Sequence, residues 1–153
     1  MRILIDADGC PVVDDAIAIA KVFALECLIL CDTSHVFTKD GATTIQFSKG
    51  PDSVDFALVN MVKKDDIVIT QDYGLAAMCL ARLARVISQN GLEYNSYNID
   101  ALLLSRHTAK KIRMAGGRLK GPKKRTSEQD LVFGAKLKEI IIEINAANKD
   151  NLQ

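Results

Sequence analysis

Short runs of aliphatic residues alternate with longer amphipathic segments along the first part of the chain. The runs 3–5, 27–31 and 67–69 contain no polar alternation, which is typical of parallel strands that are covered on both faces. Segments 14–25 and 53–62 precede two of these runs and repeat apolar residues at helical spacing. Strand–helix–strand units of this kind predict an α/β domain, a three-layer sandwich with a mostly parallel central sheet.

The same patterns predict the remaining elements. They are a strand at 43–47, a helix at 75–84, a short strand pair within 86–94, a helix from 98 to about 114 and a last helix that begins at a capping box, Thr126 to Gln129. Asp52 is expected to cap the helix at 53–62, and the polar residues 145–153 are expected to fray. We interpret 1–153 as one domain, with a basic loop and helix appended at about 98–146.

The composition excludes several classes of protein. Hydrophobic residues make up 48% of the chain and charged residues 25%, which is typical of a globular domain rather than a disordered one. No apolar run approaches the roughly 18 residues that span a membrane, and the first residues do not resemble a signal peptide. The four cysteines form no Cys-x-x-Cys pair, so neither structural zinc nor disulfides are expected. We therefore predict a cytoplasmic protein without membrane contact.

Four aspartates are placed where they can converge. Asp6 and Asp8 follow the first strand, Asp72 follows the strand at 67–70, and Asp55 lies in the first turn of a helix. If the two strands are neighbours in a parallel sheet, their carboxyl ends share one edge, where α/β proteins bind ligands. Adjacent carboxylates repel one another unless a cation compensates. Oxygen ligands suit Mg²⁺ or Mn²⁺, although Asp8 and Asp72 could instead cap helices.

Three stretches carry a resemblance to a known family. They are Ile5-Asp6-Ala7-Asp8-Gly9-Cys10-Pro11-Val12, Gly50-Pro51-Asp52-Ser53-Val54-Asp55, and Asp66 to Ala76. With Asn98-Ile99-Asp100, Gly116-Gly117-Arg118 and Gly121-Pro122-Lys123, they resemble the bacterial YaiI/YqxD family in order and over nearly the whole chain. Gly9 stands where that family more often has alanine.

The YaiI/YqxD family has no settled biochemical function, and its organisation is similar to that of PIN-like nuclease domains. Those domains place acids at the carboxyl ends of a parallel sheet, bind Mg²⁺ or Mn²⁺ and cut RNA. Thr70-Gln71-Asp72 resembles the Thr-x-Asp of that superfamily. The resemblance implies that Asp6, Asp8 and Asp72 hold a metal ion, and that Asp55 completes the shell or orients water.

Positive charge is concentrated in one part of the sequence. Residues 101–127, here called the basic segment, contain nine lysines and arginines and no acid. Such a segment is suited to nucleic-acid phosphates, although it could also be a solvated loop. Contacts between basic side chains and backbone phosphates give affinity for nucleic acid without recognising its base sequence. The residues expected to bind substrate are Arg118, Lys120, Lys123, Lys124 and Arg125.

These features predict a metal-dependent nuclease that hydrolyses phosphodiester bonds in RNA. One alternative is a phosphatase of the haloacid dehalogenase type, in which Asp6 would be the nucleophile. That mechanism needs a lysine motif and an acidic pair after a strand, whereas Asp65 and Asp66 precede theirs. Another alternative is a non-catalytic RNA-binding module. His35, after the second strand, is a further candidate beside the acids.

Overall fold

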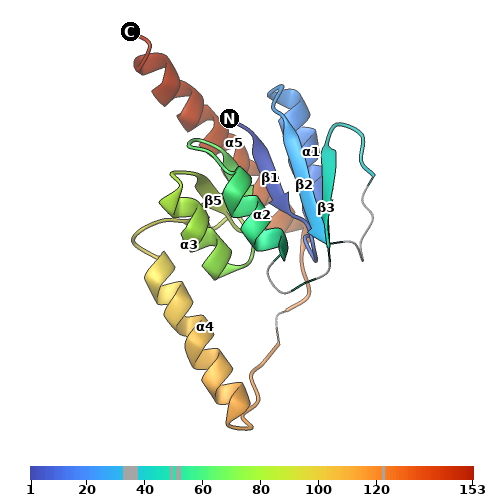
Figure 1. Cartoon of the computed structure of the whole chain (residues 1–153), viewed down its shortest axis with the longest axis vertical. Helices are drawn as coiled ribbons and strands as arrows, with labels where there is room; N and C mark the ends of the chain where they lie inside the picture. The colour runs from blue at the N-terminus through green and yellow to red at the C-terminus, as the bar shows by residue number, and fades with distance from the viewer. Residues whose placement is uncertain (33–37, 49, 51–52, 122) are drawn as a thin grey trace.

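The computed structural model describes residues 1–32, 38–48, 50, 53–121 and 123–153. Within these residues the strands form one sheet in the order β3-β2-β1-β4-β5-β6 (Figure 1). The strands are β1 (Ile3–Asp6), β2 (Cys27–Asp32), β3 (Thr43–Phe47), β4 (Ile67–Ile69), β5 (Arg85–Ile87) and β6 (Glu93–Tyr94). All neighbours are parallel except β5 and β6. Asp52 and His35 lie outside the described residues.

Two layers of helices cover the sheet, so the predicted three-layer α/β sandwich is confirmed. The helices are α1 (Val13–Val22), α2 (Ser53–Met61), α3 (Tyr73–Ala81), α4 (Ile99–Met114) and α5 (Ser127–Asp150). Alternate residues of β1 serve opposite cores, since Ile3 and Ile5 pack with α1 and α5 while Leu4 packs with α2 and α3. Strand side chains point to alternate faces, so an unbroken aliphatic run supplies both cores.

The appended element predicted at about 98–146 divides into two unlike parts. Helix α5 belongs to the main core and buries Phe133, Leu137 and Ile140 completely. Helix α4 instead extends away from the sheet (Figure 1). Its first residue, Ile99, is buried, whereas Ile112 near its other end is 40% exposed. The α4 helix therefore has an apolar base on α3 and a solvated outer half.

The amino end of α5 is capped as predicted. The Thr126 backbone N–H donates to Gln129 Oε1 at 2.9 Å and completes the capping box. The other end differs from the prediction, because α5 continues to Asp150 rather than fraying after 144. Ala146, Ala147 and Lys149 have good helix propensity, so the exposed turns extend a helix that the core already holds.

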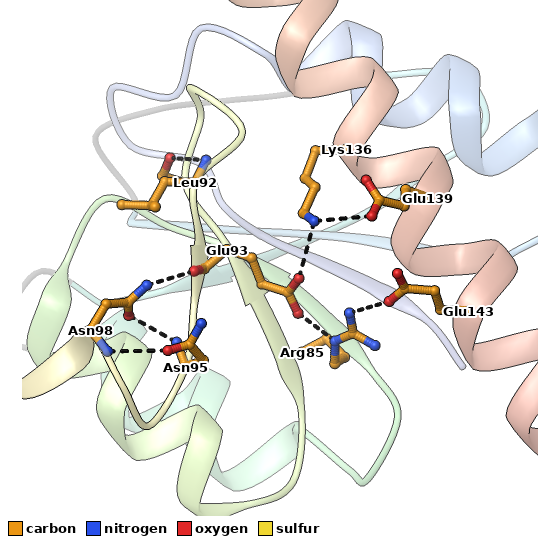
Figure 2. Close-up of polar contacts among 9 residues, drawn as sticks. Arg85, Leu92, Glu93, Asn95, Asn98, Lys136, Glu139 and Glu143 are labelled. Carbon is orange, nitrogen blue, oxygen red and sulfur yellow. Dashed lines mark hydrogen bonds and ion pairs between the residues drawn. The ribbon is translucent and has the colours of Figure 1, made fainter.

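A polar network fastens α5 to the far edge of the sheet (Figure 2). Glu93 on β6 accepts from Arg85 on β5 and lies 3.5 Å from Lys136 Nζ on α5. Arg85 Nη2 also reaches Glu143 Oε2 at 2.7 Å. The Glu93 carbonyl accepts from Asn98 Nδ2 at 2.9 Å, just before α4 begins. This network joins the short antiparallel pair to α5 and to the base of α4.

Candidate functional site

Strands β1 and β4 are neighbours, so the residues that follow them share one edge of the sheet. Thr70 Oγ1 donates to Asp6 Oδ2 at 2.8 Å and accepts from the Asp72 backbone N–H at 3.0 Å. Thr70 is almost fully buried, and its hydroxyl therefore holds the ends of both strands in a defined geometry. The predicted convergence of Asp6 and Asp72 thus takes place through an intervening threonine.

Asp6 carries the clearest electrostatic signature of the site. The pKa of its carboxyl is raised from the ordinary 3.8 to about 6, mainly by burial and also by the nearby charges of Asp55, Asp8 and Asp72, against the lowering effect of the Thr70 hydrogen bond. A raised carboxyl pKa is typical of sites where negative charge is concentrated. The other three aspartates predicted for the site therefore all lie close enough to Asp6 to affect its carboxyl.

The carboxylates line two adjoining hollows. Asp6 and Asp8 border both of them: Asp32 and Asp55 join them around a volume of about 280 Å³, and Asp72 joins them around a volume of about 480 Å³. We call the five aspartates and these two hollows the acidic crevice. Asp32 was not predicted as a site residue. It ends β2, the other neighbour of β1, and its backbone N–H donates to Asp8 Oδ2 at 3.3 Å.

Asp72 has a capping role as well as a place in the crevice. Its Oδ1 accepts from the backbone N–H groups of Gly74 and Leu75, at 2.8 and 3.1 Å, and so caps α3. The same oxygen accepts from Arg106 Nη1 at 3.1 Å. The helix-cap alternative for Asp72 is therefore correct. It is compatible with a site role, because the side chain remains 31% exposed and borders the crevice.

Arg106 on α4 is a site residue that the sequence patterns missed. It borders the larger hollow of the crevice together with Asp6, Asp8 and Asp72. A Cβ on Gly74 would lie 3.2 Å from Asp72 Oδ1 and 3.5 Å from Arg106 Nη1, so glycine at this position leaves room for the ion pair. In the sequence, Arg106 is distinguished only by its position in the basic segment. Its contact with Asp72 depends on the packing of α4 on α3, which the sequence patterns do not show.

The donor set suits a hard cation, but the side chains do not form a compact cage. No group of three or more His, Cys, Asp or Glu side chains in the described part of the chain lies close enough to hold an ion. The crevice nevertheless offers carboxylate oxygens, which Mg²⁺ and Mn²⁺ prefer. Mg²⁺ commonly uses one or two protein carboxylates and keeps several waters. The chemistry of the crevice therefore fits such an ion without a complete protein shell.

The residues expected to bind substrate fall into two groups. Arg118, Lys120, Lys123 and Lys124 are exposed. Arg125 is instead held by three partners, with Nε on Asp130 Oδ1 at 2.7 Å, Nη1 on Asn90 Oδ1 at 2.6 Å and Nη2 on the Gln89 carbonyl at 2.7 Å. The structure thus assigns Arg125 an anchoring role, and its contact with substrate stays a prediction.

The anchor of Arg125 brings one end of the basic segment close to the acids. Gln89, whose carbonyl accepts from Arg125, borders a small hollow of about 70 Å³ with Asp6, Asp8 and Cys10. The four cysteines are free thiols, and burial raises the pKa of Cys10. Cys10 therefore belongs to the packing beside the crevice, as a thiol that is poorly ionised.

Comparison with known proteins agrees with the resemblance in the sequence. The model of the uncharacterised YaiI/YqxD family matches residues 4–143. The chain belongs to this family. A UPF0178 protein from Exiguobacterium sibiricum is 51% identical over 143 residues, which cover 94% of this chain and 98% of that protein. A UPF0178 protein from Ruminiclostridium cellulolyticum is 49% identical and covers 87% of both chains.

A third YaiI/YqxD relative, a UPF0178 protein from Clostridium acetobutylicum, is 43% identical over 93% of this chain and 97% of its own length. The family match at residues 4–143 covers α4 and most of α5. No solved structure matches the chain, and the similarity to PIN-like domains stays a prediction. In the part of the chain that the structure describes, no helix is long and apolar enough to cross a bilayer.

Proposed function

We propose that the protein is a cytoplasmic, metal-dependent nuclease that hydrolyses phosphodiester bonds in RNA, using the acidic crevice in a PIN-like arrangement. The observation that carries the proposal is the position of Asp6. Its carboxyl is bound to Thr70 beside three further aspartates, and burial with their charge raises its pKa to about 6. A fold gains no stability from concentrating repelling acids in this way, so the arrangement favours a role in binding a cation.

In this proposal Asp6, Asp8 and Asp72 hold Mg²⁺ or Mn²⁺, and Asp55 completes the shell or orients the attacking water. A bound ion would supply activation of water and stabilisation of charge on the phosphate. Thr70 keeps Asp6 oriented through its hydrogen bond. The capping bonds to Gly74 and Leu75 fix Asp72 at the amino end of α3. Asp6 ends β1 and Asp55 lies on α2, so these two carboxylates stand on regular elements, and Asp72 is held at the start of α3.

Nucleic acid is the proposed substrate because Arg106 borders the crevice and Arg125 anchors the end of the basic segment beside it. The exposed residues Arg118, Lys120, Lys123 and Lys124 would contact the phosphate backbone, and Arg125 fastens this stretch beside Gln89. Binding through the backbone would weaken as salt is added, roughly in proportion to the number of phosphates contacted. The wild type and a variant with Lys120, Lys123 and Lys124 changed to glutamine should therefore differ in the slope of affinity against salt.

The deciding experiment is a calorimetric titration of the metal-free protein with Mn²⁺, with RNA cleavage assayed on the same samples. The test variants are Asp6→Asn and Asp72→Asn, since asparagine keeps the shape and can still accept the bonds from Thr70 and Gly74. Asp100→Asn is the matched control, because Asp100 is an exposed carboxylate on α4. We expect binding and cleavage in the wild type and the control, and loss of both in the two crevice variants.

Each other outcome has a definite meaning. Mn²⁺ binding without cleavage of any RNA would contradict the nuclease and leave a metal site. RNA binding that needs neither the ion nor the crevice carboxylates would favour the non-catalytic RNA-binding module. Phosphate trapped covalently on Asp6 would favour a phosphatase of the haloacid dehalogenase type, in which that carboxylate is the nucleophile.

A further inference from the structure

A separate hollow lies against the acidic crevice where three helices meet. Its volume is about 250 Å³, and its lining comes from α2, α3 and α4 together with the residue that caps α3. The lining residues that matter here are Asp55, Phe56, Asp72, Leu75, Met78 and Arg106. Because Asp55 and Asp72 also border the crevice, the hollow opens directly beside the proposed reaction site.

The hollow has an apolar part and a cationic part. Phe56 is 60% exposed and Met78 is 38% exposed, so an aromatic face and a thioether are available to a ligand. Arg106 has a side chain that is 60% exposed, and its guanidinium lies at the boundary with Asp72. This combination of an exposed aromatic ring and an arginine distinguishes the hollow from the neighbouring acidic crevice, where carboxylates dominate. The lining therefore suits a ligand with a flat apolar group and an anionic group.

The size of the hollow limits what its apolar part can accept. Sites that enclose a whole small-molecule ligand typically have roughly 300–1,000 Å³, so about 250 Å³ suits a single ring system rather than a complete nucleotide. Arg106 stands where an anionic group attached to that ring system would emerge toward the crevice. A base inside the hollow would thus place its phosphate close to the carboxylates.

We propose that this hollow is a nucleobase subsite, which takes one unpaired base of a single-stranded RNA next to the scissile phosphate. The base packs on Phe56 and Met78, and Arg106 pairs with the adjoining phosphate. The inference rests on the proposed nuclease function and narrows its substrate to unpaired RNA, because a base inside a duplex has no free face to offer. Lysines elsewhere in the basic segment supply affinity for RNA, whereas this subsite makes the protein prefer single-stranded RNA to duplex RNA.

Arg106 also connects the two sites. Its Nη1 now donates to Asp72 Oδ1 at 3.1 Å, and both partners are partly exposed, so the pair is held only weakly. A phosphate in the subsite would compete with Asp72 for the guanidinium, which binds phosphate oxygens well. Binding of the nucleotide would thereby release Asp72 from its arginine partner, while Asp72 keeps its capping bonds from Gly74 and Leu75.

The test uses AMP, ribose 5-phosphate and adenosine as probes, in buffer with Mg²⁺, and follows binding by NMR. We expect AMP to bind the wild type at least about fivefold more tightly than ribose 5-phosphate, as stacking on an aromatic ring predicts. Phe56→Ala should remove that difference, and Phe56→Leu should retain only part of it. Arg106→Gln should weaken AMP and ribose 5-phosphate alike and leave adenosine unchanged.

Two control variants match these changes away from the hollow. Tyr97→Ala removes an aromatic ring that is 95% exposed, and Arg82→Gln removes an exposed arginine at the end of α3. Neither should alter AMP binding. The subsite is overturned if AMP does not bind at millimolar concentration, or if Phe56→Ala binds AMP and ribose 5-phosphate with the same ratio as the wild type.

Cleavage assays separate this inference from the function on which it rests. Single-stranded RNA should be cut at least tenfold faster than the same sequence in a duplex, and Phe56→Ala should lose most of that preference without losing Mn²⁺ affinity. If RNA is cleaved with no dependence on strand form or on Phe56, the subsite is wrong and the nuclease stands. If AMP binding depends on Phe56 and no RNA is cleaved, the subsite stands and the nuclease is wrong.

Discussion

Thr70 holds Asp6 in place by donating from Oγ1 to Asp6 Oδ2 at 2.8 Å, while it accepts from the backbone N–H of Asp72. One hydroxyl therefore connects the ends of two neighbouring strands. The bond stabilises the ionised form of Asp6, against the effects of burial and of the nearby carboxylates. Thr70 is thus a positioning residue for the acidic crevice.

Thr70→Val should raise the pKa of Asp6 above its value of about 6, because the hydrogen bond that lowers it is lost. Mn²⁺ needs the ionised carboxylate, so the pH at which binding reaches half its maximum should move upward. NMR titration of Asp6 and calorimetry across pH 5–8 would measure both shifts. Thr70→Ser keeps the hydroxyl and should behave as the wild type. An unchanged midpoint in Thr70→Val would contradict this role.

Asp6→Asn should stabilise the metal-free protein at neutral pH. The pKa of Asp6 is raised from 3.8 to about 6 in the folded state, so the folded protein binds the proton more tightly than the unfolded chain does. The stability that the protonated Asp6 carboxyl gives to the folded state is complete below pH 3.8 and is lost as the pH rises through 6. A difference of this size corresponds to at most about 3 kcal/mol.

Urea unfolding of the wild type and Asp6→Asn between pH 4 and 7.5 would measure this effect. The free energy of unfolding of the wild type should fall relative to that of Asp6→Asn across this range. Added Mn²⁺ should reverse the order at neutral pH, because it stabilises only the protein that binds it. A variant less stable than the wild type at pH 7.5 without metal would show that the carboxylate serves the fold.

Arg2 and Asp66 should matter for stability and not for the crevice. Asp66 is 3% exposed and accepts from Arg2 Nη2 at 2.6 Å, from the Arg2 backbone N–H at 2.9 Å and from the Lys63 N–H at 2.9 Å. These contacts join the amino ends of β1 and β4, at the edge opposite the crevice. Asp66→Ala leaves the Arg2 guanidinium and two backbone N–H groups without their acceptor, and should lower the free energy of unfolding by about 3 kcal/mol or more.

Chemical denaturation would measure that cost, with Asp65→Asn as the control. Asp65 has a φ of 66°, which asparagine tolerates well, so its replacement should change stability by less than about 0.5 kcal/mol. Mn²⁺ affinity measured on folded Asp66→Ala should equal that of the wild type. A loss of affinity would show that the two edges of the sheet are coupled.

Arg125→Gln should loosen the basic segment. The side chain is held by Asp130, Asn90 and Gln89, and two of these bonds, to Asp130 and Gln89, are partly buried. Their loss should cost about 1 kcal/mol. Backbone amides between 118 and 126 should then exchange hydrogen faster, as measured by mass spectrometry. Lys124→Gln changes an exposed neighbour and should leave exchange unaltered. Equal exchange in both variants would contradict the anchoring role.

Much of the fold could be predicted from the sequence because it depends on local patterns. Unbroken aliphatic runs mark strands that are buried on both faces, and Ile3, Leu4 and Ile5 serve two cores as that pattern requires. The capping box at Thr126 likewise acts within one turn of helix. The extension of α5 to Asp150 was missed, since a polar sequence indicates exposure and exposed residues can continue a helix that is already formed.

The sequence by itself determined that Asp6 and Asp72 lie at or just after the carboxyl ends of strands, and therefore that they could meet at one edge of a sheet. Only the tertiary structure decided which other side chains join them. Asp32 enters the crevice because β2 is the other neighbour of β1, and Arg106 enters it because α4 packs on α3. Phe56 borders the adjoining hollow because α2 packs beside α3. Contacts between residues distant in the chain depend on strand order and helix packing, which no local pattern specifies.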